Sequence, residues 1–388
     1  MTSIQNDFLL IDEMLTEEER MVRDTVREFV QDRVMPTVAE NFEEAEAPVH
    51  LVREMGEMGI IGATLPEEYG CPGSSYVIYG LIQQELERGD GGVRSLNSGQ
   101  SSLVMYPIYA YGSEEQRRHW LPRLARGEKI GCFALTEADH GSDPGGMKTR
   151  AVKDGESYIL NGSKMWITNG NIADVAVVWA KLDGQVKGFL VEKGTPGFEA
   201  NLIKHKMSLR ASVTSELVFD DCRIPAENLL PRSGGLRSPL ACLDKARYGI
   251  AWGAIGAAMA CYEASVRYAK ERTQFDKPIG SFQLVQRKLS LMLTEMTMGQ
   301  LLNLRVGRLK DEGKDRHQHT SMAKMNATSK ALEIARMARD LHGANGISLE
   351  YPIIRHMNNL ESVHTYEGTY DIHLLILGQE ITGISAFR

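Results

Sequence analysis

The sequence predicts an α+β fold in which two helical segments flank a β domain. Thr16 and Glu19 form a capping box ahead of an apolar stripe with helical spacing, which indicates that the first segment is helical. Short β-branched and aromatic runs separated by glycine and asparagine turns follow, and long helical periods then return. The expected domains are an all-α domain at 1–131, a β domain at 132–235 and a second α domain at 236–388.

The apolar stripe of the first segment predicts which face of its opening helix is buried and where the helix ends. Val22, Val26, Phe29 and Val30 fall on one helical face. Pro36 is expected to end this helix, because proline lacks the N–H group that a helix interior requires. A chain of 388 residues exceeds what one compact core usually holds, which agrees with several domains.

The other two segments also have recognisable periods. Gly280, Gly313 and Gly343 separate the long helical periods of the third segment. The apolar stretch 250–262 is too short to cross a bilayer and is rich in alanine and glycine, so we expect a buried helix there. The turn-rich stretch 232–239 is expected to link the β domain to these helices. The strands expected in the middle segment include the runs 158–160, 175–179 and 189–191.

Composition and charge exclude several classes of protein. The formal net charge of −7, without a concentrated basic run, argues against a nucleic-acid-binding protein. The first 13 residues lack the features of a secretory signal or a transit peptide, so we expect a cytoplasmic protein, or a mature matrix protein in a eukaryote, without membrane insertion. The five cysteines are widely spaced, which predicts reduced thiols and no metal site: Cys71, Cys132, Cys222, Cys242 and Cys261.

The first candidate for chemistry is Arg94 with Ser95, in the string ELERGDGGVRS. A helix is expected to end at Gly89 and to be followed by a glycine-rich turn that presents both side chains. The planar guanidinium can bind a carboxylate through two parallel hydrogen bonds, and the serine hydroxyl can add another donor. A solvated arginine beyond a helix end is the alternative, and it is the commoner situation for this residue type.

Two strings in the β segment could face a flat cofactor that carries phosphate. In FALTEADHGSD, Gly141 and Ser142 leave backbone N–H groups free after a strand-like start, and Thr136 adds a hydroxyl. In KMWITNG, Trp166 offers a flat apolar face and Thr168 a hydroxyl, which together could cover a flavin ring. Taken singly, a tryptophan within a β run is more often a core residue.

The last part of the chain holds candidates for anion binding and for a general base. ERTQFDKPIGSFQ could bind a pyrophosphate through Arg272, and LHGANG could do so through N–H groups, although LHGANG also resembles an ordinary glycine cap. In TYEGTYDIH, Glu367 lies between an aromatic residue and a glycine. A carboxylate in an apolar cleft has a raised proton affinity that suits removal of a proton from carbon, whereas a loop glutamate is ordinarily solvated.

The order of these strings resembles the acyl-CoA dehydrogenase family over essentially the whole chain. The helical first segment is followed by FALTE with GSD, WITN, CLDKARYGIA, ERTQF, HGANGI and TYEGT. The resemblance implies an N-terminal helical bundle, a middle β-barrel or sandwich and a C-terminal four-helix bundle, with FAD bound between domains. It also implies an enzyme that oxidises an acyl-CoA, and a homotetramer in which one subunit completes the FAD site of another.

The resemblance assigns roles to individual positions. Glu367 matches the catalytic base, Gly368 follows it in the matching place, and Thr369 is implied to lie at the flavin edge. Asp340 and Ala344 depart from the usual glutamine and glycine, which affects contact details and not the cofactor. The other residues implied to contact FAD are Phe133, Leu135, Thr136, Gly141, Ser142, Trp166, Ile167, Thr168, Arg272, Phe275, Gln283, Asp340, Gly343 and Ala344. Those implied to contact the thioester, pantetheine or nucleotide of the substrate are Ser142, Leu243, Asp244 and Arg247.

The acyl end resembles the glutaryl-CoA dehydrogenases within this family. Those proteins pair a glutamate with an Arg-Ser dipeptide, as Glu87, Arg94 and Ser95 do here, and they share the strings QSSLVM and KMSLRAS. A guanidinium in the acyl pocket would offset the cost of burying the second carboxylate of glutaryl-CoA. Tyr366, before the base, is similar to members that also remove CO2, whereas the non-decarboxylating members carry valine.

The resemblance therefore implies an oxidative decarboxylation. Glu367 removes the α-proton, the β-hydride passes to the flavin, and glutaconyl-CoA loses its terminal carboxylate to give crotonyl-CoA and CO2. Electron-transferring flavoprotein is the expected partner that reoxidises the cofactor. Two alternatives stay open: a dehydrogenase or oxidase for a neutral short or branched acyl-CoA, and a DNA-damage-associated flavoprotein of the same fold, which the net charge of −7 disfavours.

Overall fold

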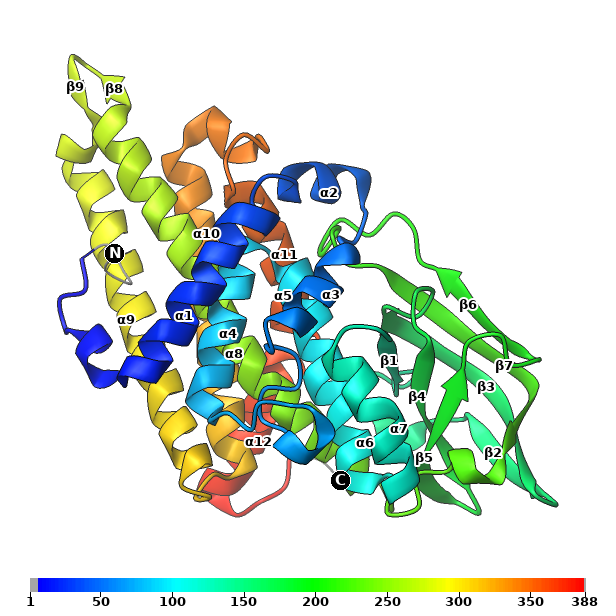
Figure 1. The fold of residues 1–388 in the computed structure, drawn as a ribbon. Helices are drawn as coiled ribbons and strands as arrows, with labels where there is room; N and C mark the ends of the chain where they lie inside the picture. Colours follow the sequence, from blue (N-terminus) through cyan, green and yellow to red (C-terminus); the bar gives the residue numbers. More distant parts are fainter. Residues whose placement is uncertain (1–5, 387–388) are drawn as a thin grey trace.

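The computed structural model describes residues 6–386, and the chain begins with helices (Figure 1). Thr16 caps the first helix as predicted: its hydroxyl accepts a hydrogen bond from the N–H of Glu19 at 3.2 Å, and the Glu19 carboxylate accepts one from the N–H of Thr16 at 2.8 Å. The helices are α1 (Glu17–Phe29), α2 (Val38–Glu44), α3 (His50–Glu57), α4 (Tyr76–Gly89), α5 (Gly91–Ser98), α6 (Tyr106–Tyr111) and α7 (Glu114–Ala125). Two π-helical turns, η2 (Val30–Val34) and η4 (Gly99–Met105), continue α1 and α5.

The buried face of α1 is the one that the sequence predicts. Val26, Phe29 and Val30 are buried, Val22 is partly buried, and the helical backbone of α1 and η2 ends before Pro36. Short 3-10 turns punctuate this segment and the later ones: η1 (Ile11–Met14), η3 (Glu67–Tyr69), η5 (Pro144–Gly146), η6 (Ala226–Asn228) and η7 (Ile279–Ser281).

The middle of the chain forms one curled sheet of seven strands with its own apolar core. The strand order is β1-β4-β2-β3-β7-β6, and β5 pairs with β4. β4 runs parallel to β1 and β2, and all other pairs are antiparallel. The strands are β1 (Gly131–Ala134), β2 (Arg150–Asp154), β3 (Ser157–Thr168), β4 (Val175–Leu182), β5 (Gln185–Glu192), β6 (Phe198–Leu202) and β7 (Thr214–Pro225). The runs predicted at 158–160, 175–179 and 189–191 lie in β3, β4 and β5, so these predictions are confirmed.

The rest of the chain is a bundle of long helices and a small hairpin. The apolar stretch 250–262 lies inside the first long helix and is almost entirely buried, as predicted. The expected linker 232–239 is shorter than predicted, because this helix already begins at Arg237. The elements are α8 (Arg237–Glu271), β8 (Thr273–Gln274), β9 (Lys277–Pro278), α9 (Gln283–Asp311), α10 (His317–Leu341), η8 (Gly343–Ile347), α11 (Ile353–Thr365) and α12 (Tyr370–Thr382).

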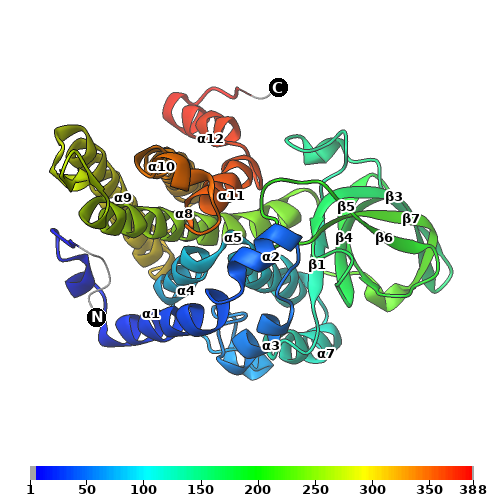
Figure 2. The same cartoon turned by 90° about the horizontal axis from the view of Figure 1, so that it is seen from above.

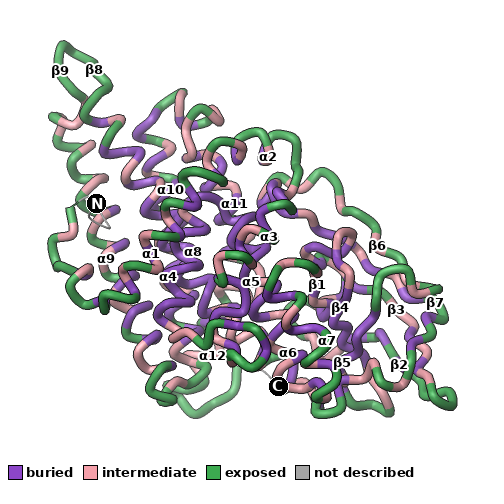
Figure 3. Tube along the Cα trace, viewed as in Figure 1, coloured by how far each residue is buried: buried purple, intermediate pink, exposed green. Residues whose placement is uncertain are grey.

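The two helical parts share one apolar core, beside which the β domain lies (Figure 2). Small residues let α8 cross α4 at close range: a Cβ on Gly256 would lie 1.9 Å from the carbonyl oxygen of Gln84, and a Cβ on Gly253 would lie 2.1 Å from Oε2 of Glu87. Figure 3 shows the buried trace running through α4, α8 and α10, whereas the β8–β9 hairpin is exposed. Among residues 6–386, no helix has both the length and the apolar character needed to span a membrane.

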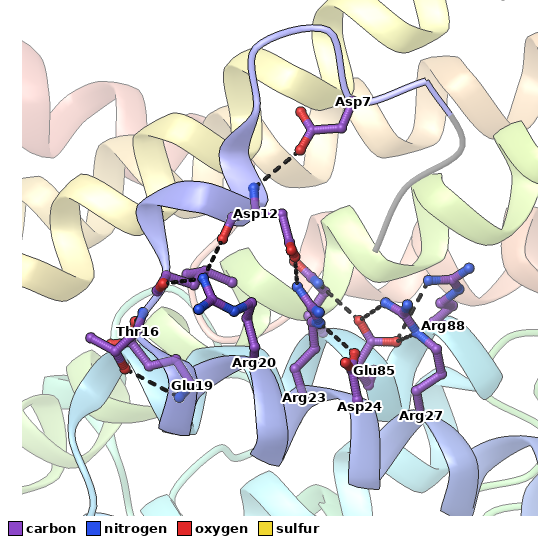
Figure 4. A network of polar contacts seen from close by, with 12 residues as sticks. Asp7, Asp12, Thr16, Glu19, Arg20, Arg23, Asp24, Arg27, Glu85 and Arg88 are labelled. Atoms are coloured by element: carbon purple, nitrogen blue, oxygen red, sulfur yellow. Dashed lines mark hydrogen bonds and ion pairs between the residues drawn. The ribbon is translucent and has the colours of Figure 1, made fainter. Parts of the chain in front are cut away.

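A network of charged side chains fastens α1 to this core (Figure 4). The carboxylate of Glu85, on α4, is buried and accepts hydrogen bonds from Nε and Nη2 of Arg27, both at 2.9 Å. Arg88 lies 3.6 Å from the same carboxylate. Farther along α1, Glu19 forms an ion pair with Arg308 of α9. Paired in this way, the buried charge of Glu85 is compensated and the N-terminal helix has a defined position on the bundle.

Candidate active site

Arg94 and Ser95 lie on a helix and not in a glycine-rich turn, so that prediction was wrong. Asp90 has an extended backbone between α4 and α5, and its carboxylate accepts a hydrogen bond from the N–H of Gly92 at 2.6 Å. Asp90 therefore acts as the N-cap of a new helix. The cap is itself held by α11, because Asp90 Oδ2 accepts hydrogen bonds from Arg355 at 2.5 Å and from Asn359 at 2.9 Å.

The guanidinium of Arg94 is buried and held in a fixed orientation. Its Nε donates to Oε2 of Glu87 at 2.6 Å, its Nη1 donates to the Ser98 hydroxyl at 2.8 Å, and its Nη2 donates to the Tyr366 hydroxyl. The side chain is 1% exposed, which excludes the solvated alternative. Burial disfavours its charge, but Glu87 outweighs this effect and the pKa of Arg94 lies above its ordinary value.

Two buried oxygens beside this arginine have no hydrogen-bond partner among the described residues. They are Oε1 of Glu87 and Oγ of Ser95. A guanidinium carries one N–H on Nε and two on each terminal nitrogen, so the three bonds of Arg94 leave one N–H on Nη1 and one on Nη2. Burying polar groups without partners is costly, and it is tolerated where a ligand can supply the partners.

Glu367 occupies the short connection between α11 and α12. Tyr366 caps α11, and the Thr369 hydroxyl caps α12 by accepting a hydrogen bond from the N–H of Ile372 at 3.2 Å. Glu367 has a φ of 52° and Gly368 one of 99°, so the base candidate has the left-handed backbone that non-glycine residues rarely adopt. Its carboxyl Oε2 is buried without a hydrogen-bond partner in the described part of the chain, so Glu367 is not the freely solvated loop glutamate of the alternative.

Positive side chains surround Glu367. Arg247 of α8 donates from Nε to the carbonyl oxygen of Glu367 at 2.6 Å, and Lys324 of α10 lies close by. Burial raises the pKa of Glu367, and the charges of Arg94, Lys324 and Arg247 only partly oppose this rise. Burial likewise lowers the pKa of Lys324 to about 7. Tyr366 joins the arginine and the base candidate into one site, because its side chain contacts Arg94 and its backbone precedes Glu367.

The predicted flavin-facing strings of the β domain lie side by side. Met165 donates from its N–H to the carbonyl oxygen of Thr136 at 2.8 Å. The buried Lys164 donates to the carbonyl oxygen of Leu135 at 3.0 Å and to Oε1 of Glu137 at 2.9 Å. Burial opposes the charge of Glu137, but hydrogen bonds from Thr149 and other donors lower its pKa to about 2. The two strings are therefore joined through a buried ion pair.

The side chains on this surface differ in burial. Trp166 is 59% exposed and has a φ of 63° at a bulge in β3, so the core alternative for this tryptophan is excluded. Leu135 and Ile167 point into the interior, so only their backbone groups can face a cofactor. Gly141 has open space where a Cβ would be. Phe133, Thr136 and Thr168 are partly exposed, and Ser142 is exposed.

A third group of predicted residues is brought together elsewhere on the molecule. The β8–β9 hairpin lies at the end of the helical bundle far from the β domain (Figure 1). The predicted residues on and near this hairpin are all exposed: Arg272, Phe275, Gln283, Asp340, Gly343 and Ala344. Gly343 has a φ of 58° directly after α10, which is the glycine-cap geometry that the string LHGANG also suggested. Within one chain, this group and the β-domain surface do not meet.

The predicted substrate contacts on α8 face different partners. Asp244 accepts a hydrogen bond from the buried Lys310 at 3.3 Å through Oδ2, whereas its buried Oδ1 has no partner among the described residues. Leu243 is partly buried beside it. Among the described residues no cluster of potential ligands could hold a metal ion, and all five cysteines are buried free thiols.

Lys324 was not predicted from the sequence, although a signal for it exists. It lies on α10 at helical spacing from Ala327, Thr328 and Ala331, all of which are buried. A lysine on the buried face of a helix requires a polar partner inside the protein. The helical period of α10 could therefore have identified it.

Comparison with known proteins agrees with this arrangement. Family models for three acyl-CoA dehydrogenase domains match consecutive parts of the chain: the N-terminal domain at 16–128, the middle domain at 132–222 and the C-terminal domain at 233–382. The chain belongs to the acyl-CoA dehydrogenase family. It is therefore an FAD-containing oxidoreductase that acts on acyl-CoA, with the fold that the sequence predicts.

Solved structures and curated relatives extend this likeness. This acyl-CoA dehydrogenase is similar to glutaryl-CoA dehydrogenase from Mycobacterium smegmatis, at 55% identity and a TM-score of 0.97, with 99% of each chain covered. A structure of a glutaryl-CoA dehydrogenase from Mycobacterium smegmatis in complex with FADH2 matches at 52% identity and a TM-score of 0.97, with 98% of this chain and 99% of that chain covered. The mitochondrial short-chain specific acyl-CoA dehydrogenase of Rattus norvegicus is 36% identical over 369 residues, which cover 94% of this chain and 90% of the relative.

Proposed function

We propose that this acyl-CoA dehydrogenase oxidises and decarboxylates glutaryl-CoA to crotonyl-CoA and CO2. One observation carries the proposal: a buried, oriented guanidinium, that of Arg94, contacts the residue that precedes the base candidate Glu367. A substrate with a thioester at one end and a carboxylate at the other matches such a pair. The similarity to glutaryl-CoA dehydrogenase at 55% identity supports the same substrate.

Arg94 recognises the second carboxylate of the substrate. One N–H remains on Nη1 and one on Nη2, so the guanidinium can donate to both oxygens of a carboxylate. Glu87 and Ser98 fix the orientation of that plane, and the partnerless hydroxyl of Ser95 can donate to the same carboxylate. A neutral acyl chain would leave these donors without partners, which costs free energy and gives selectivity.

Glu367 removes the α-proton of the thioester. Burial raises its proton affinity, and its Oε2 accepts no hydrogen bond from residues 6–386, so the carboxylate is available to a C–H group. Bound FAD would supply the acceptor for the β-hydride, and the surface around Trp166 and Thr168 would hold it. Apart from its chain neighbours, no described residue has an atom within 4 Å of where a Cβ of Gly141 would be, and Trp166 is exposed, so this surface leaves room for the cofactor.

Decarboxylation follows from the same site. Once the α–β bond is unsaturated, loss of CO2 leaves a dienolate whose charge spreads onto the thioester. The Tyr366 hydroxyl contacts Arg94, the residue proposed to bind the departing carboxylate, and burial keeps its pKa above the ordinary value, so the tyrosine stays a neutral donor. Glu367, now protonated, can return its proton to give crotonyl-CoA.

We further propose a homotetramer in which a neighbouring copy completes each FAD site. The exposed group around the β8–β9 hairpin lies too far from the β-domain surface to serve the same flavin within one chain. Large apolar side chains are exposed on the hairpin, on α9 and at the end of α12, and other copies could bury them. They are Phe275, Leu284, Leu291, Met298, Ile381 and Ile384. Electron-transferring flavoprotein is the proposed acceptor of the electrons.

The purified yellow protein should distinguish the substrates directly. Under anaerobic conditions we expect glutaryl-CoA to bleach the flavin fastest and butyryl-CoA and isovaleryl-CoA to be at least about tenfold slower. The neutral substrates leave the buried donors of Arg94 and Ser95 unpaired, which costs about 1.4 kcal/mol or more, or about a factor of ten. Turnover with an artificial electron acceptor should release CO2 and crotonyl-CoA in equal amounts. Faster bleaching by a neutral acyl-CoA would favour that substrate class, and glutaconyl-CoA without CO2 would remove the decarboxylation step.

The ion pair below the flavin-facing surface gives a second prediction. Lys164→Met should weaken FAD binding about tenfold or more and lower the free energy of unfolding by about 1–3 kcal/mol, because the Leu135 carbonyl and the Glu137 carboxylate each lose a buried donor. FAD titration and urea unfolding measure the two effects. Lys153→Met, at an exposed position of β2, is the matched control. Equal FAD affinity in both variants would contradict the role of the pair.

A further inference from the structure

We propose that Lys324 is a positioning residue for the catalytic base: it binds the backbone on both sides of Glu367 and tunes the carboxylate by its charge. The proposal rests on the proposed role of Glu367 as the base. It adds a residue of α10 whose hydrogen bonds go to backbone carbonyl oxygens and which therefore acts through the main chain.

The geometry is a clamp on three consecutive carbonyl groups. Lys324 Nζ donates to the carbonyl oxygen of Tyr366 at 2.6 Å and to that of Gly368 at 2.7 Å. Arg247 Nε donates to the carbonyl oxygen between them, that of Glu367, at 2.6 Å. Lys324 is 0% exposed, so its ammonium group is committed to these partners and not to solvent.

The backbone of Glu367 needs such a clamp. A φ of 52° at Glu367 is a left-handed backbone conformation that a non-glycine residue keeps only where its surroundings hold it. Hydrogen bonds from a charged donor to buried carbonyls are stronger than neutral ones. Because Lys324 and Arg247 come from α10 and α8, the rigid bundle itself fixes the direction of the carboxylate.

The charge of Lys324 also acts on Glu367. The charged groups that face the carboxylate are Arg94 of α5, Arg247 of α8 and Lys324 of α10, with the neutral hydroxyls of Tyr79 and Tyr366 nearby. His373 of α12 faces Lys324, and burial lowers its pKa to about 3, so it is neutral near pH 7. Lys324 carries its charge mainly below its own pKa of about 7, and losing that charge should raise the pKa of Glu367 further.

The test compares Lys324→Met with Lys324→Arg and with Lys330→Met. Lys330 is a partly exposed residue of the same helix that forms an ion pair with Glu333. Anaerobic flavin reduction is followed from pH 6 to 10 with glutaryl-CoA and with butyryl-CoA. We expect Lys324→Met to lower the limiting rate roughly 100-fold with both substrates, to leave KM within about threefold, and to move the rising limb of the pH profile to higher pH. Arginine, which can also donate to two carbonyls, should restore about tenfold, and Lys330→Met should match the wild type.

Several outcomes would overturn the proposal. An FAD-loaded Lys324→Met protein with a wild-type rate or an unmoved pH limb shows that the clamp does not position the base. If that variant does not fold, Lys324→Arg and Lys324→Gln are compared instead. A rising limb at higher pH in the glutamine variant than in the arginine variant supports the proposal, and identical pH profiles overturn it. Bleaching of the wild type by butyryl-CoA alone would remove the glutaryl assignment and leave this test intact, because the clamp acts on any acyl-CoA.

Discussion

Glu367→Gln should retain FAD and lose flavin reduction by every acyl-CoA, by roughly 10²–10⁴-fold, the usual contribution of a general base. The amide has nearly the same shape as the carboxylate and cannot take a proton from carbon. Burial raises the pKa of Glu367, so the wild-type rate should rise with pH as the carboxyl loses its proton. The variant should lack this rising limb. Stopped-flow absorbance of the flavin from pH 5 to 9 measures both effects.

The control for this variant is Glu361→Gln. Glu361 lies on the adjacent helix α11, is exposed, and forms an ion pair with Arg336 at the surface. Its replacement makes the same change of charge without touching the base, so flavin reduction should be unchanged. Residual bleaching of Glu367→Gln at rates close to those of the control would move the base assignment to another carboxylate.

The order of elements could be predicted from the sequence because it depends on local periods. The capping box at Thr16 and the strand runs of the middle segment each report on a few neighbouring residues, and the structure forms them. The string DGG before Arg94 was misinterpreted, because an aspartate with two glycines suits a turn as well as an N-cap. Only the packing of α11 on Asp90 decides between the two.

Burial and long-range partners decided the rest of the site. An arginine, a loop glutamate and a tryptophan in a strand each have a commoner interpretation than the one the structure shows. Burial overturns it for Arg94 and Glu367, and exposure overturns it for Trp166. Lys324 lies more than 40 positions before Glu367, and its partners are backbone carbonyls, which carry no residue identity. Such a contact leaves no motif, although the buried face of α10 does mark the lysine.

Arg94→Gln should cut kcat/KM for glutaryl-CoA by roughly 10²–10³-fold, which corresponds to losing about 3–4 kcal/mol from a buried charge-assisted pair. The loss for butyryl-CoA should be less than about tenfold, since that substrate has no second carboxylate. The ratio of the two losses is the measurement. Equal losses would indicate that Arg94 serves the fold of the site and would favour a neutral acyl-CoA as the substrate.

A second variant separates recognition from stability. Removing Arg94 alone leaves the carboxylate of Glu87 buried without its cation, which should lower the free energy of unfolding by about 3–5 kcal/mol. Adding Glu87→Gln removes that charge, so the double variant should regain much of the lost stability. It should not regain the preference for glutaryl-CoA, because neither amide can neutralise the substrate carboxylate. If the double variant recovered that preference, the charge of Arg94 would not be what selects the dicarboxylic substrate.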